Sequence, residues 1–293
     1  MTDRKILVTH HSPDLDAIGA VWILKKFDSQ HYADAKIAFV NPGERITEQK
    51  LQNFGIDIDQ ATHVDTGKGK FDHHQPERAS KMICAVSLTY EYVNELHPEL
   101  KKDQALKKLV DFVNEIDHFQ EIHWPQADST RYVMMIHQLI QGHELTQPHN
   151  DDSQMHFGLK CLDYAYNVMK HTLQAQTIIK EDGINFTLGQ KPCLGLETCN
   201  GITIKEAQKM GYALVVRKDD KQGNIRIKVR PDSDLNLKSL YNQIKKIDQT
   251  GTWFFHPGGK MLLNGSKSHH NQIPSPLSLK EIMALIKKTY GKK

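Results

Sequence analysis

The chain has 293 residues, of which 39% are hydrophobic and 25% are charged. This composition suits a globular protein with a full core and excludes a disordered chain or a disulfide-stapled miniprotein. No apolar run approaches the roughly 18–20 residues of a membrane-spanning helix, and the first residues lack the pattern of a signal peptide. We therefore expect a cytoplasmic protein of two domains with no membrane partner. The net charge is only +3, but the 17 histidines are an unusual number, and histidine is the commonest metal ligand.

Strands and helices alternate in the first part of the chain. In chain order, the pattern predicts a strand at 5–8, a helix at 17–27, strands at 36–40, 61–64 and 70–71, and helices at 84–96 and 103–116. This alternation is typical of an α/β fold with a doubly wound parallel sheet. In such a sheet ligands gather beyond the carboxyl ends of the strands. The chain places polar side chains there, namely His10, Asp14, Asp65 and Asp72.

The middle of the chain predicts a loop and then a long helix. Residues 143–154 are polar, contain Pro148 and predict a loop. Apolar residues then recur at spacings of three and four over 155–173, which predicts an amphipathic helix with a narrow apolar stripe. Two interpretations remain open, a connector between two domains or the pairing helix of a homodimer.

The last part of the chain predicts a second, smaller α+β domain. The predicted elements are strands at 213–217 and 224–230 and helices at 235–247 and 277–288. We divide the chain into a metal-binding domain over 1–150, a connector helix over 151–183 and a substrate-binding domain over 184–293.

The charge is unevenly distributed between these parts. Residues 181–293 contain 19 Lys and Arg against 10 Asp and Glu. Residues 1–180 contain 19 against 25, together with 14 of the 17 histidines. The acidic, histidine-rich part suits cations and the basic part suits anions.

Three short segments of the first domain concentrate carboxylates and imidazoles. They are His10-His11-Ser12-Pro13-Asp14-Leu15-Asp16, Val64-Asp65-Thr66-Gly67 and Asp72-His73-His74-Gln75. Oxygen and nitrogen ligands without sulfur suit Mn²⁺, Zn²⁺ or Fe²⁺. Asp14 and Asp16 can each hold a different ion while a third carboxylate bridges the two. Two ions about 3.5–4 Å apart clamp a phosphoryl group and generate hydroxide near neutral pH.

At these three segments the sequence resembles the DHH phosphoesterase superfamily. His10, Asp14 and Asp16 resemble its first motif, Asp65 its second, and Asp72-His73-His74 its third. The motifs occur in the family's order within 74 residues. The resemblance implies two divalent ions, which we expect to be Mn²⁺.

The resemblance also implies a role for each motif residue. His10 and Asp14 would bind the first ion, Asp16 and His73 the second, and Asp65 would bridge them. His74 would face the phosphate or order the attacking water, and Asp72 would orient its neighbouring histidines. The family's fourth motif is an aspartate after a helix, for which Asp117 is the better match and Asp111 the alternative. We expect His11 to make no metal contact.

The second domain resembles the substrate-binding DHHA1 domain of the same family. A strand that ends in Arg230 is followed by a helix and then by Phe255-His256-Pro257-Gly258-Gly259-Lys260. The resemblance implies that Arg230, His256, Gly258, Gly259 and Lys260 hold the phosphate or nucleotide. The sequence departs from the family pattern because the aromatic run at 253–255 stands where glycines usually precede the histidine. Those aromatic residues are either core or a stacking surface for a base.

The sequence therefore predicts a dinuclear metal-dependent phosphoesterase that hydrolyses nucleotides or short single-stranded oligonucleotides by attack of a metal-activated hydroxide. Within the family it is most similar to the exonuclease branch with a DHHQ motif, and more distantly to RecJ-type nucleases and nano-RNases. An inorganic pyrophosphatase is the first alternative, although its C-terminal Ser-Arg-Lys-Lys-Gln signature is absent. A non-catalytic nucleotide sensor is the second.

Overall fold

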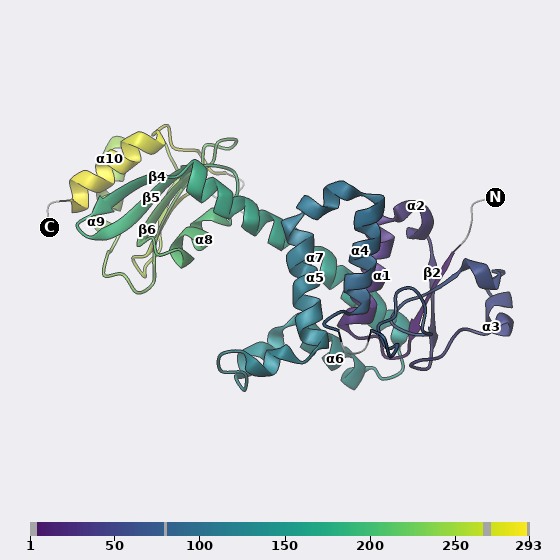
Figure 1. Cartoon of the computed structure of the whole chain (residues 1–293). Coiled ribbons are helices and arrows are strands. Elements are labelled where there is room, and N and C mark those ends of the chain that lie inside the picture. Colours follow the sequence, from purple (N-terminus) through teal and green to yellow (C-terminus); the bar gives the residue numbers. More distant parts are fainter. Residues whose placement is uncertain (1–4, 79–80, 266–270, 292–293) are drawn as a thin grey trace. The chain divides into compact units, whose positions relative to one another are not determined.

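The computed structural model describes residues 5–78, 81–265 and 271–291. The first four residues, on which the expectation of no signal peptide partly rests, lie outside the described residues. The chain forms two compact units, residues 1–169 and 170–293 (Figure 1). The boundary falls inside the long helix α7, Asp151–Glu181. This helix is long enough to cross a bilayer but too polar, and none of the helices described has the apolar character to do so.

The first unit contains a parallel sheet of three strands in the order β2-β1-β3. The strands are β1 (Ile6–His10), β2 (Lys36–Val40) and β3 (Ala61–His63). Ile6 lies opposite both Lys36 and Ala61, so all three strands end at one edge of the sheet. The coarse prediction of a parallel α/β sheet is confirmed. The predicted strand at 70–71 is wrong, because Phe71 forms only a single bridge to Val64.

Helices supply most of the core of this unit. They are α1 (Leu15–Phe27), α2 (Ser29–Tyr32), α3 (Glu48–Gln52), α4 (Ala85–Leu96), α5 (Gln104–Asp117), α6 (Ile136–Thr146) and the first part of α7, with short 3₁₀ turns at Ile58–Gln60, Pro98–Lys102, Gln120–His123 and Thr130–Met134. Residues 15–24 of α1 are all buried, as expected for a helix that is apolar on every side. Helix α1 packs against α4 and α5.

Gly19 determines how closely α1 approaches α4. A Cβ atom at Gly19 would lie 2.5 Å from Cγ2 of Val86. This distance is too short for a carbon–carbon contact, so a larger residue here would force α1 or the Val86 side chain to shift.

The predicted loop over 143–154 is wrong at both ends. Helix α6 continues to Thr146, and α7 begins at Asp151. Asp151 lies in the first turn, where a carboxylate is favourable. Asp151 also accepts hydrogen bonds from His11 and Ser12. These contacts hold the start of α7 at an earlier residue than the apolar pattern predicts.

The second unit contains a sheet of six strands in the order β4-β5-β6-β7-β9-β8. The strands are β4 (Ile184–Leu188), β5 (Lys191–Glu197), β6 (Leu214–Lys218), β7 (Ile225–Val229), β8 (Trp253–Phe255) and β9 (Met261–Asn264). Only β5 and β6 are parallel, and the other neighbours are antiparallel. The helices are the end of α7, α8 (Thr203–Lys209), α9 (Lys238–Ile247) and α10 (Leu279–Tyr290).

The two faces of this sheet differ. One face packs Ile225, Ile227 and Val229 of β7 against α9 and α10. The opposite face is covered near β5 and β6 by Ile179 of α7 and by α8. The sequence pattern found β6 and β7 but missed β4, β5, β8 and β9. Strands β5, β8 and β9 lack a clean two-residue alternation, whereas β4 alternates and was missed although its pattern is present.

Candidate metal centre

The three motifs meet at the carboxyl ends of β1 and β3. His10 is the last residue of β1, and Asp65 follows the end of β3. Asp65 has a φ of 55°, in the left-handed region that Asp and Asn tolerate better than most residues. Its N–H donates to the carbonyl of Phe71 at 2.8 Å, which sets the turn that places the carboxylate at the strand ends.

Asp14 and Asp16 are fixed by helix termini. Asp14 is the N-cap of α1, and one of its oxygens accepts the N–H groups of Asp16 and Ala17 at 3.0 Å. Asp16 is buried, and its two oxygens accept the N–H groups of Ala85 and Val86, at 2.7 and 2.8 Å, at the start of α4. A buried carboxylate at this helix end is stabilised by the positive end of the helix dipole.

Asp72 acts as a structural anchor for the third motif. Its Oδ2 accepts the N–H of Lys68 at 2.6 Å, and its Oδ1 accepts the N–H of His74 at 3.0 Å. The same Oδ1 lies 2.9 Å from Nδ1 of the His74 ring. The ring of His74 is therefore held by Asp72, although 62% of its side chain is exposed.

Asp65 lies between two groups of possible metal ligands. Its Oδ2 is 3.3 Å from Nε2 of His10, and its Oδ1 is 3.3 Å from Nε2 of His73. Three sets of side chains have ligand atoms close enough to share an ion, namely His10-Asp14-Asp65, Asp16-His73-Asp117 and Asp65-His73-His74.

Several atoms in these sets are buried without a hydrogen-bond partner. They are Oδ1 of Asp65, Nε2 of His73 and Oδ2 of Asp117. Buried polar atoms are normally paired, and these three atoms belong to side chains that converge on one another. This convergence of unpaired oxygen and nitrogen atoms fits divalent cations as the missing partners.

The charges of the cluster perturb its pKa values strongly. Burial lowers the pKa of His10 and of His73, but the neighbouring carboxylates, Asp65 first, outweigh it and raise both to about 9. Burial and the nearby carboxylate Asp65 hold the pKa of Asp16 well above its usual range. Burial raises the pKa of Asp117 to about 6. The cluster therefore holds more negative charge than its own imidazoles balance, and a divalent cation would relieve this excess.

The structure separates the two candidates for the fourth motif. Asp117 ends α5, and its Oδ2 lies 3.9 Å from Nε2 of His73. Asp111 is exposed on the same helix and belongs to none of the three ligand sets in the described part of the chain. Nδ1 of the neighbouring His118 donates to the carbonyl of Asn114 at 2.8 Å, which is a helix-end contact.

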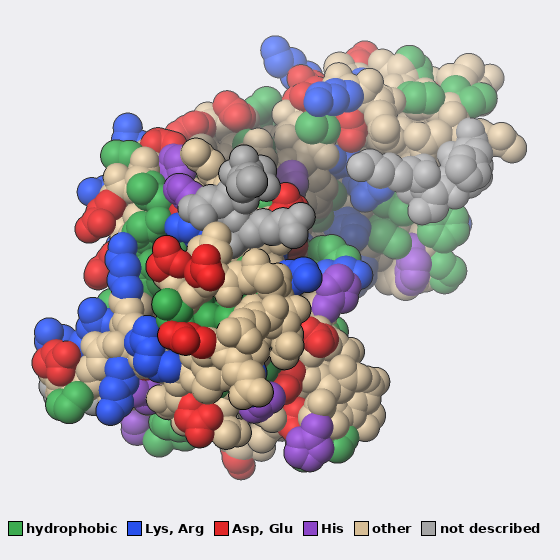
Figure 2. All heavy atoms as spheres, turned by 90° about the vertical axis from the view of Figure 1, so that its right-hand side faces the viewer, with side chains coloured by type: hydrophobic (Ala, Val, Ile, Leu, Met, Phe, Trp, Pro, Cys, Tyr) green, Lys and Arg blue, Asp and Glu red, His purple; other side chains and the backbone are tan. Residues whose placement is uncertain are grey.

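Other histidines of the first unit have structural partners. His11 is hydrogen-bonded through Nδ1 to Asp151 at 2.6 Å, and Asp151 also accepts the N–H of Ser12 at 2.7 Å. His63 accepts the N–H of Ile46 at 3.0 Å, and burial lowers its pKa to about 4. On the face shown in Figure 2, histidines are scattered and not gathered in one patch.

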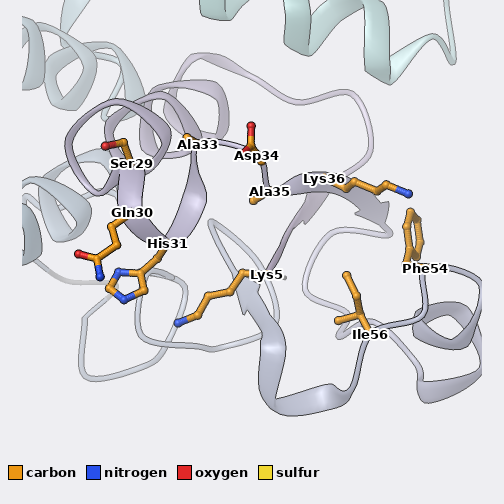
Figure 3. Close-up of a pocket in the computed structure, with 10 residues that line it drawn as sticks. All are labelled: Lys5, Ser29, Gln30, His31, Ala33, Asp34, Ala35, Lys36, Phe54 and Ile56. Carbon is orange, nitrogen blue, oxygen red and sulfur yellow. The ribbon is translucent and has the colours of Figure 1, made fainter. Parts of the chain in front are cut away.

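Two cavities of the first unit differ in their relation to these residues. The larger one, about 560 Å³, is lined by Lys5, Lys36 and Phe54 among others (Figure 3). Lys5 precedes β1 and Lys36 begins β2, so this cavity lies at the amino ends of the strands, opposite the ligand sets.

The second cavity, about 370 Å³, adjoins the ligand sets and is lined by Asp14, Asp16, Asp117, Phe119, Glu121 and His137, among others. The sequence pattern did not single out Phe119, Glu121 or His137, because no motif spacing connects them to the ligand residues.

The predicted substrate residues all belong to the second unit, where each has partners within the fold. Arg230 follows β7 and forms an exposed ion pair of 2.6 Å with Asp232. His256 follows β8, and its Nδ1 accepts the N–H of Gly258 at 3.1 Å. Gly259 has a φ of 73°, and a Cβ there would lie 2.5 Å from Nδ2 of Asn236.

Lys260 is occupied by main-chain contacts. Its ammonium group donates to the carbonyl of Leu235 at 2.9 Å and to that of Ser233. These bonds connect the glycine segment to the residues that precede α9.

Comparison with known proteins finds similarity to solved structures but no match in sequence. No protein-family model matches the chain, and no curated protein matches it. Among solved structures, one similar chain is described as a "Member of s1p family of ribosomal proteins" with a DHH domain. The two chains are 11% identical, the match covers 99% of this chain and 87% of the other, and the TM-score is 0.34. Similarity at this level establishes neither the fold nor the activity of this chain.

Proposed function

We propose that this protein is a dinuclear metal-dependent phosphoesterase of the DHH type that acts on nucleotides or short oligonucleotides. The position of Asp65 carries the proposal, because its two oxygens face His10 and His73, which belong to different ligand sets. A carboxylate placed in this way suits a bridge between two cations.

The residues present fit two cations of the Mn²⁺ type. His10 and Asp14 would hold one ion, Asp16, His73 and Asp117 the other, and Asp65 both. Such a pair of ions, when bound, supplies an activated water near neutral pH and neutralises charge on the phosphoryl oxygens. Mixed imidazole and carboxylate ligands favour Mn²⁺, Zn²⁺ or Fe²⁺ over Ca²⁺.

The remaining motif residues would position the substrate. Asp72 holds Nδ1 of His74, which leaves Nε2 of this exposed ring to contact a phosphoryl oxygen. In the second unit, Arg230 would bind a phosphate in exchange for its exposed partner Asp232, since exposed ion pairs of this kind contribute little to stability. The N–H groups of Gly258 and Gly259 already donate to Nδ1 and to the carbonyl of His256, at 3.1 and 2.9 Å, so they do not contact an anion in this arrangement.

The test is a substrate panel with two matched variants on one helix. The full chain is loaded with Mn²⁺ and offered short RNA, short DNA, cyclic dinucleotides and pyrophosphate. We expect phosphoester hydrolysis by the wild type, loss of at least about 100-fold in Asp117→Asn, and little change in Asp111→Asn, which lies outside the ligand sets.

Several outcomes would contradict this proposal. If pyrophosphate alone is hydrolysed, the protein is a pyrophosphatase, and if nucleotides bind without turnover, it is a sensor. If Asp111→Asn and Asp117→Asn lose activity equally, the assignment of the fourth ligand is wrong.

A further inference from the structure

One half of the six-stranded sheet has a face that no helix covers among the described residues. The apolar cluster on this face joins Ile179 and Ile204 to β5 and β6, and none of its members lies on β7, β8 or β9. The opposite face of those three strands, in contrast, belongs to the main core of the unit. The uncovered area is therefore one face of the three strands β7, β9 and β8.

The strand register shows which side chains share this area. Arg217 of β6 lies opposite Arg226 of β7, Arg226 opposite Leu263 of β9, and Leu263 opposite Phe254 of β8. Directly opposed residues point to the same face, about 5 Å apart. The chain thus builds a row of two guanidinium groups, an aliphatic side chain and an aromatic ring.

A second row lies beside the first. Lys228 is two residues after Arg226 on β7, so it points to the same face at a distance of about 6.7 Å along the strand. His256 lies beside Met261, to which it is joined by a main-chain hydrogen bond of 3.0 Å. We call Arg217, Arg226, Lys228 and Phe254 the cationic face.

The arginines of the cationic face are incompletely satisfied. Arg217 is 3% exposed, donates to the carbonyl of Thr198 at 3.1 Å and lies 3.5 Å from Asp219. Its Nε and the Nε of Arg226 are both buried without a hydrogen-bond partner. Among the residues that the structure describes, Arg226 and Lys228 form no ion pair.

Asp219 pairs with Arg217, but Arg226 and Lys228 have no acidic partner among the described residues, so a bound anion would stabilise this face. Like charges directly opposite in an antiparallel pair destabilise it. Burial, together with the charge of Arg226, lowers the pKa of both Arg217 and Lys228, as expected where positive charge accumulates. Guanidinium groups with free N–H donors match the oxygens of a phosphate.

The aromatic ring narrows the choice of anion. Phe254 is 53% exposed, whereas its neighbour Trp253 is buried and donates to Asp248 at 2.7 Å. The structure therefore divides the aromatic run into a core residue and a surface ring. Cations beside an exposed ring on an open sheet are typical of surfaces that bind single-stranded nucleic acid.

We propose that the cationic face binds a single-stranded oligonucleotide, with phosphates at Arg226 and Lys228 and a base stacked on Phe254. The inference deepens the proposed function, on which it rests, by making oligonucleotides rather than mononucleotides the substrate class. Partly buried guanidinium groups beside a ring favour this occupant over a membrane, which would require protruding cationic side chains.

The test measures binding separately from hydrolysis. A fluorescent single-stranded RNA of about 12 nucleotides is titrated with the full chain in EDTA, and anisotropy is recorded at several salt concentrations. We expect the double variant Arg226→Gln/Lys228→Gln to bind more weakly and to lower the slope of log affinity against log salt by about 1.4. The control double variant Lys245→Gln/Lys246→Gln removes equal charge from exposed positions of α9 and should change both quantities less.

A second variant tests the ring without changing the charge. Phe254→Ala should weaken binding by about 5- to 150-fold. Ile247→Ala, which removes another exposed apolar side chain of the same unit, should leave binding close to that of the wild type. Because Phe254 is exposed, this pair remains informative even if the charge variant does not fold.

The results separate the two proposals. The cationic face is refuted if both test variants bind RNA as their controls do, or if the face binds anionic lipid vesicles and not RNA. Hydrolysis by the wild type in Mn²⁺ is measured in a separate assay. RNA binding without hydrolysis contradicts only the proposed function. Hydrolysis, with neither test variant changing RNA binding, contradicts only the proposal that the cationic face binds the oligonucleotide.

Discussion

Replacing Asp65 by Asn is the most direct perturbation of the candidate metal centre. The change removes one negative charge and keeps the shape of the side chain. Asn also tolerates the φ of 55° at this position, so the turn after β3 should persist. Alanine would be a poorer choice, because its loss of function would include backbone strain.

Two opposing effects determine the magnitude at pH 7. Removing a buried charge partner costs about 3–5 kcal/mol, and Asp65 would serve two ions, which gives about 6–10 kcal/mol of lost binding energy. Against this, Asp65 helps to hold the pKa of His10 and of His73 at about 9, so each imidazole must lose a proton before it binds a metal.

The second effect is the smaller one. Two pH units correspond to about 2.7 kcal/mol for each histidine, so relief of this cost in Asp65→Asn offsets at most about 5 kcal/mol. The remaining loss of about 1–5 kcal/mol predicts that the overall affinity for two Mn²⁺ ions falls at least about fivefold.

The assay is calorimetric titration of the metal-free chain with Mn²⁺, followed by elemental analysis after dialysis. The wild type should retain two ions per chain and Asp65→Asn fewer, with Asp111→Asn as a control that removes an exposed carboxylate. If Asp65→Asn retains two ions with an affinity within threefold of the wild type, Asp65 does not bridge them and the reasoning is refuted.

Two further predictions concern the stability of the units. Although burial opposes it, hydrogen bonds from Ser275 and other donors keep the pKa of Asp248 below its usual range, so its contribution is present above about pH 4 and is lost as pH falls through the folded-state pKa. Asp248→Asn should thus lower the free energy of unfolding by about 2–3 kcal/mol at pH 7 and by less near pH 3, as measured by urea denaturation, while the control Asp220→Asn, at an exposed position, should change the free energy of unfolding less at pH 7. In the first unit, Gly19→Ala should destabilise by about 1–3 kcal/mol through overlap with α4, whereas Gly142→Ala, which meets nothing within 4 Å, should stabilise slightly; equal thermal shifts for the two would contradict the packing argument.

The sequence by itself determined the local elements that place the ligand residues. The apolar runs ending at His10 and before Asp65 predicted strands, and the structure has β1 and β3 at these positions. The same logic failed where tertiary contacts outweigh local pattern: α7 begins at Asp151 because His11 and Ser12 hold that carboxylate, and residues 140 apart in sequence carry no spacing signal.

Only the tertiary structure decided which polar groups meet. Asp111 and Asp117 lie on one helix and differ little in sequence context, yet only Asp117 reaches His73. The opposition of Arg217 and Arg226 depends in the same way on strand register, which no run of residues encodes alone. The periodicity of apolar residues shows which side of a helix or strand is buried. Which side chain of another element lies against it is set by how the elements pack and by strand register, and the chemistry of both units depends on these contacts.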